Sequence, residues 1–233
     1  TTFRRIGAPL SATARTLWLL LSSLARLTVR WLSHAPATTV VTVALTLMSA
    51  TYWVWRDQFS VLEASPSASH WWSIFSSVGA VPGHFLATAV LGIATMIVAG
   101  GAAERHLGTR VWIASALAGQ VVGVTATWAT LPLLKRAITE WGQAIGEGTL
   151  WGTSLMLIAL AGAAVQSLGA RWRWRARFLL IGILALSSAI LGSAISYARV
   201  WALLAGMVAA RLAGVRGERT DSLDDITIGR QLA

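Results

Sequence analysis

The sequence predicts an all-α integral membrane protein with about six transmembrane helices and both ends in the cytoplasm. Apolar residues make up 55% of the 233-residue chain, charged residues make up 12%, and the mean hydropathy is +0.64. Since a soluble domain carries roughly 25% charged residues, lipid rather than water must cover much of this surface. The second observation is that Lys and Arg gather on one side of the apolar stretches.

Six apolar stretches approach the length of about 20 residues that spans a bilayer. They lie near Thr38–Trp55, Gly83–Ala103, Val111–Thr130, Leu150–Leu168, Phe178–Ser193 and Ala198–Gly214. The fifth stretch is short, and its limits are the least well defined of the six. We therefore expect six spanning helices joined by loops.

The distribution of cations sets the orientation. With a cytoplasmic N-terminus, all but four of the 19 Lys and Arg residues fall inside, and the four outside are Arg56, Lys135, Arg136 and Arg199. Because cytoplasmic loops carry the excess of cations, both ends are expected inside. The net charge of +10 then reflects topology and attraction to membrane lipids, not nucleic acid. The Arg and Ala bias favours a bacterial plasma (inner) membrane.

The flanking segments give three predicted regions: 1–36, 37–214 and 215–233. In the first, Ser11–Ser33 alternates apolar and basic residues, which predicts an amphipathic helix on the cytoplasmic surface or a helix packed against the bundle. The Trp-rich loop Arg56–Pro82 is expected to dip into the outer interface. The tail at 215–233 is polar and then apolar, as expected if the native protein continues beyond Ala233.

Four motifs follow one another along the chain. They are the Trp-rich His70–Ser76, Pro82-Gly83-His84 at the start of the second span, the acidic and Gly-containing turn Glu104–Arg110, and Gly152-Thr153-Ser154 at the start of the fourth span. Together they resemble the rhomboid family of intramembrane serine proteases over about Ser69–Gly214. The resemblance implies a rhomboid-like bundle of six helices, N-in and C-in.

The resemblance also implies where the site residues lie. The family's nucleophile position corresponds to Ser154, its base position to Arg199, seven residues before Gly206, and its two oxyanion positions to His84 and Thr88. The family has His, not Arg, at the base position, Asn where Thr88 stands, and Gly after the serine, where this chain has Leu155.

These departures predict a catalytically inactive member. Serine needs a neighbouring base to take its proton, and arginine stays protonated in proteins. The leading hypothesis is therefore a pseudoprotease that binds a transmembrane helix or lipid without proteolysis. The alternatives are an active serine protease that uses Ser154 with His84, and the membrane module of a lipid-modifying or lipid-translocating protein such as an aminoacyl-phosphatidylglycerol synthase.

Structural explanations remain open for the same residues. Ser154 is also a suitable small residue at a helix contact. Arg199 is able to extend to the outer interface, or to pair with Glu140, Glu147 or a lipid phosphate. The run Arg171–Arg175, which alternates Arg and Trp, is typical of a membrane-surface anchor. No metal site or cofactor is expected, because the chain has no Cys and four scattered His residues.

Overall fold

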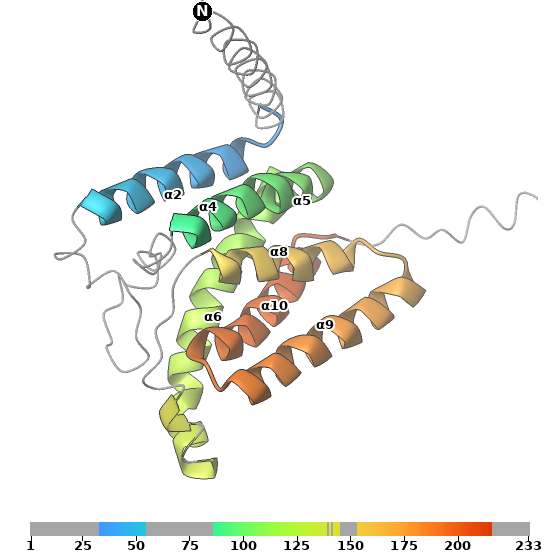
Figure 1. The fold of residues 1–233 in the computed structure, drawn as a ribbon. Coiled ribbons are helices and arrows are strands. Elements are labelled where there is room, and N and C mark those ends of the chain that lie inside the picture. The colour runs from blue at the N-terminus through green and yellow to red at the C-terminus, as the bar shows by residue number, and fades with distance from the viewer. Residues whose placement is uncertain (1–32, 55–85, 139, 141, 145–152, 216–233) are drawn as a thin grey trace, which may run out of the picture.

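A computed structural model describes residues 33–54, 86–138, 140, 142–144 and 153–215, and their regular structure is entirely helical (Figure 1). The helices are α2 (Pro36–Val54), α4 (Leu86–Thr95), the π-helical turn η3 (Met96–Gly100), α5 (Gly101–Leu107), α6 (Thr109–Ala137), α8 (Ser154–Gln166), α9 (Ala170–Leu191) and α10 (Ala194–Leu212). The amphipathic segment, the Trp-rich loop and the tail from residue 216 lie outside the described residues.

Three helices in the described part, α6, α9 and α10, are long and apolar enough to cross a membrane. Two further helices are apolar, namely α2 over Pro36–Thr51 and the shorter α8. The prediction of an all-helical chain with helices able to cross a membrane is thereby confirmed for the described residues.

Helix α9 begins earlier than the sequence indicated. The turn between α8 and α9 takes only residues 167–169, and α9 starts at Ala170. The Arg171–Arg175 run, expected in a loop, therefore forms the first turns of a helix. Arginine is a good helix former, and charged side chains are tolerated where a helix end reaches the membrane interface.

Small residues let α8 pack between α6 and α10. A Cβ atom added to Gly206 of α10 would overlap the backbone of Ala159 in α8, and one added to Gly119 of α6 would overlap the Ala159 side chain. One added to Gly162 would meet the carbonyl of Leu203. Such close backbone approach is how helices gain packing energy in a lipid environment, where hydrophobic burial offers little.

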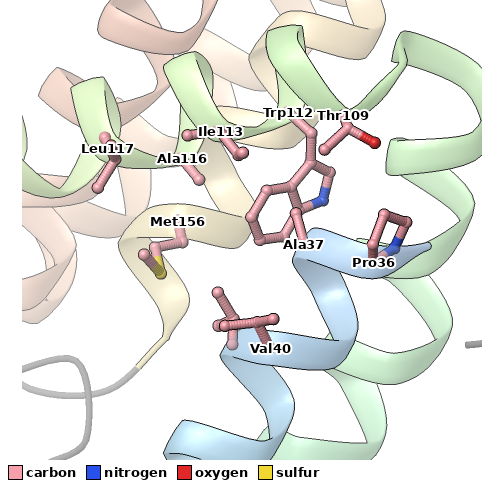
Figure 2. Close-up of a pocket in the computed structure, with 10 residues that line it drawn as sticks. Pro36, Ala37, Val40, Thr109, Trp112, Ile113, Ala116, Leu117 and Met156 are labelled. Carbon is pink, nitrogen blue, oxygen red and sulfur yellow. The ribbon is translucent and has the colours of Figure 1, made fainter.

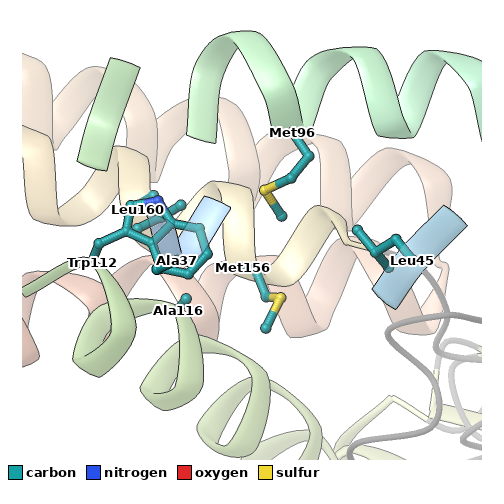
Figure 3. Packing of buried hydrophobic residues seen from close by; sticks show 7 residues of the cluster. All are labelled: Ala37, Leu45, Met96, Trp112, Ala116, Met156 and Leu160. Carbon is teal, nitrogen blue, oxygen red and sulfur yellow. The ribbon is translucent and has the colours of Figure 1, made fainter. Parts of the chain in front are cut away.

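A cluster of buried hydrophobic residues joins α2 to the other helices. It consists of Ala37, Leu45, Met96, Trp112, Ala116, Met156 and Leu160 (Figure 3). The Trp112 ring is 2% exposed, and its Nε1–H donates a hydrogen bond of 2.9 Å to the carbonyl O of Gly100, at the end of the π-helical turn. The indole thus packs as an apolar body while its polar atom is satisfied, as buried Trp requires.

Glu104 ties the start of α2 to α5 and α6. Its carboxylate accepts hydrogen bonds from the backbone N–H of Ala37 at 2.9 Å and of Thr38 at 2.7 Å, and from Thr109 Oγ1 at 2.8 Å. A helix N-terminus favours negative charge and exposes unpaired N–H groups. Burial raises the pKa of Glu104, but the hydrogen bonds outweigh this effect, so the pKa lies below its ordinary value of 4.5.

Candidate functional site

Ser154 is the first residue of α8. Its side chain is half-buried, and its Oγ is buried without a hydrogen-bond partner in the described part of the chain. The next residue, Leu155, is 1% exposed and packs in a cluster with Ala198 and Ala202 of α10. The residue after the serine therefore lies in the packed contact between the two helices.

Arg199 lies near the start of α10 and is also half-buried. Its neighbour Ala198 belongs to the cluster that contains Leu155, so Arg199 and Ser154 lie at the same level of α10 and α8. The Arg199 Nε is buried and has no partner among the described residues. The fold brings the two positions to one end of the helix pair, and no hydrogen bond involves the Ser154 Oγ there.

Two indole N–H groups lie near the same end. Trp128 of α6 packs against the Leu155 cluster, and Trp201 of α10 makes an edge-to-face contact with Tyr197 at 6.3 Å between ring centroids. Their Nε1 atoms are buried without partners in the part that the structure describes. Indole and guanidinium are donors only. The described groups here can hold an acceptor, but none of them can take the proton of Ser154.

The other two predicted positions are placed only in part. His84 lies outside the described residues. The backbone of Thr88 is in α4, and its side chain is not described. One turn further along α4, a Cβ atom on Gly92 would lie 3.9 Å from Thr153 Oγ1. Helix α4 therefore runs past the start of α8.

The structure also contains a serine–histidine contact that the sequence did not indicate. His106 Nε2 lies 2.6 Å from Ser167 Oγ, at the opposite end of α8 from Ser154. The Ser167 hydroxyl donates its hydrogen to the carbonyl of Ala164 at 2.7 Å, which leaves its oxygen to accept from His106 in the tautomer that carries a hydrogen on Nε2. This arrangement joins α5 to the end of α8 and does not activate the serine.

An apolar groove runs between α2, α6 and α8, with a volume of about 360 Å³. Figure 2 shows Trp112 and Ile113 of α6 together with Val40 of α2 and Met156 of α8 along it. Val40 is 69% exposed, Ile113 42% and Leu117 44%. The lining is nearly all hydrocarbon, so its occupant must be apolar as well.

Comparison of the chain with protein-family models, curated proteins and solved structures finds no match.

Proposed function

We propose that this chain is a rhomboid-like membrane protein that binds a transmembrane helix of another protein without cutting it. The observation that carries the proposal is the lack of a base beside Ser154 among the described residues. Its Oγ is buried and has no partner among the described residues, and the residue at the base position of α10 is Arg199. An unactivated serine hydroxyl is a poor nucleophile.

The arrangement of the helices supports the same proposal. Helix α8 has 13 residues and begins at the serine, and small residues bring it against α6 and α10. A fourth helix that starts at the serine is what the resemblance to rhomboid proteases implies. The proposed bundle has six spanning segments, and the second comprises α4, η3 and the start of α5.

The groove supports binding of a helix rather than of a polar ligand. Beside it, α2 exposes Val40, Val43 and Leu47 on one side, with exposed fractions of 69%, 52% and 63%. This spacing of three and four residues is that of one helix face. A partner helix could pack along this face and place side chains in the groove.

Two measurements test the proposal on the purified protein in detergent micelles or nanodiscs. The first is labelling of Ser154 by a fluorophosphonate, together with cleavage of model transmembrane substrates, for the native chain and for Ser154→Ala. We expect neither labelling nor cleavage that depends on Ser154. Cleavage abolished by Ser154→Ala would overturn the proposal.

The second measurement is photo-crosslinking in native membranes from a diazirine amino acid placed at Val40. Ile190 of α9 provides the matched control, because it is also apolar and 73% exposed but lies away from the groove. We expect a discrete protein adduct from Val40 and only lipid adducts from Ile190. Lipid adducts alone from both positions would contradict helix binding.

The active-protease alternative keeps one specific observation in its favour. The Ser154 Oγ is unpartnered among the described residues, so it is free to receive a base from the segment that contains His84. In that case His84→Ala and Ser154→Ala should each abolish cleavage. Loss of cleavage in both variants would establish this alternative.

A further inference from the structure

Gln166 is the last residue of α8 and is 1% exposed. Its Oε1 accepts a hydrogen bond from Arg177 Nη2 of α9. Its Nε2 is buried and has no partner in the described part of the chain. A buried amide donor without an acceptor is costly, so an acceptor from outside the described residues is expected here.

Arg177 provides a second unsatisfied donor beside the first. Its Nε is also buried and unpartnered within the described ranges. The guanidinium is partly desolvated and lies in the positive field of Arg211, at the end of α10, and of Arg173. Three helices thus direct positive charge and free N–H groups to one place.

Neither carboxylate in the described part of the chain neutralises this charge. Glu104 is committed to the backbone of α2 and to Thr109. Glu140 is exposed and follows α6, whose last turn is at the opposite end from Thr109. A partly buried guanidinium whose Nε is buried without a partner is unfavourable without a counter-charge, which implies an anion from outside the described residues.

We propose that Arg177, Gln166 and Arg211 bind a phosphate group, and that its source is the head group of an anionic phospholipid. Arginine presents its N–H groups in a planar fork that matches phosphate oxygens, and the Gln166 amide adds a further donor. This inference is independent of whether the chain binds a partner helix.

The surroundings favour a lipid over a soluble phosphate. Trp172 and Trp174, one or two turns before Arg177 on α9, are 65% and 59% exposed. Arg175 stacks over Trp172 at 5.5 Å from the ring centroid. Exposed Trp and Arg at a helix end are typical of the head-group layer. Beyond Arg177, α9 exposes Phe178 and Leu179, which places the guanidinium at the boundary between head groups and acyl chains.

The test measures binding of fluorescent phosphatidylglycerol to the full chain in maltoside micelles, with dioleoylglycerol as the analogue that lacks phosphate. We expect saturable binding of phosphatidylglycerol only. Arg177→Gln should weaken it by about tenfold or more, which corresponds to about 1.4 kcal/mol. The control is Arg171→Gln, which removes the same charge from an exposed position on α9 and should change the affinity by less than about threefold.

A second variant separates a loss of lipid binding from a failure to fold. Gln166→Glu supplies a carboxylate next to Arg177 and removes the amide donor, so the protein should keep or gain thermal stability while losing phosphatidylglycerol binding. Native affinity in both Gln166→Glu and Arg177→Gln would overturn the proposal.

Two further experiments identify which anion occupies the site. If inorganic phosphate displaces the lipid and stabilises the protein without it, the phosphate site stands and its source is soluble. If replacing Glu218, Asp221, Asp224 and Asp225 by amides raises the affinity more than about tenfold, carboxylates of this chain occupy the site and the proposal is wrong. We expect neither phosphate displacement nor such a gain.

Discussion

The backbone N–H of Thr38 donates a hydrogen bond of 2.7 Å to the carboxylate of Glu104, 66 residues further along the chain. The same carboxylate also binds Ala37 N–H and Thr109 Oγ1. One buried side chain therefore satisfies the start of α2 and joins it to α6 across the Gly108 turn. Since α2 also forms one wall of the groove, Glu104 fixes where that wall begins.

Replacing Glu104 by Gln should destabilise the protein. The amide nitrogen would face a backbone N–H, two donors in a buried place, and the negative charge at the helix N-terminus would be lost. We expect the free energy of unfolding to fall by about 1–3 kcal/mol, measured by denaturant titration in mixed micelles. The matched control is Glu140→Gln, which changes an exposed carboxylate and should alter stability by less than about 0.5 kcal/mol.

The Glu104 carboxylate should also make the free energy of unfolding depend on pH. The pKa of Glu104 is lower in the folded chain than its ordinary value of 4.5, so the unfolded chain binds a proton first as the pH falls. The stabilisation is therefore complete above the ordinary pKa and is lost as the pH falls through the folded one. Unfolding free energies measured across this range should show that loss in the native chain and a smaller one in Glu104→Gln. An equal dependence of the unfolding free energy on pH in the two proteins would contradict the assignment of this effect to Glu104.

Gly206→Ala tests the close packing of α8 on α10. The added methyl group would overlap the backbone of Ala159, so the helices must separate, at a cost of about 1–3 kcal/mol. Gly182→Ala in α9 is the control, because its added methyl group has no neighbour within 4 Å. It should be neutral or stabilising by up to about 1 kcal/mol through helix propensity. Similar thermal shifts for the two variants would argue against the close crossing.

Trp112→Phe isolates the indole hydrogen bond to Gly100. The ring remains apolar, but the carbonyl of Gly100 loses its donor, and we expect a loss of about 1 kcal/mol or more. Trp174→Phe is the comparison, since Trp174 is 59% exposed and should tolerate the change. Thermal unfolding followed by circular dichroism distinguishes the two variants. An unchanged midpoint for Trp112→Phe would show that this hydrogen bond does not stabilise the protein.

The sequence by itself predicted the helical secondary structure of the chain and its apolar surface. Hydropathy and the length of apolar stretches are local properties, and a lipid solvent leaves the backbone few choices besides helix. Each of the six predicted stretches overlaps a helix in the described part. The structure differs at the start of α9, where Arg171–Arg175 lies in the helix rather than in a loop, because a helix can carry Arg and Trp into the interface.

The candidate site could be proposed from the sequence only through a resemblance to a family. Spacing from Gly206 selected Arg199, and a Gly-x-Ser motif selected Ser154. That their neighbours Ala198 and Leu155 share one packed cluster is a property of the tertiary structure, because no local pattern indicates which helix faces meet.

Only the tertiary structure decided which polar groups pair. Glu104 with Thr38, His106 with Ser167, and Arg177 with Gln166 join residues 66, 61 and 11 positions apart. In lipid, apolar faces are nearly equivalent, so hydropathy does not specify contacts between helices. Those contacts follow from where glycine and alanine allow backbones to approach and where a buried donor meets an acceptor, and both require the whole fold.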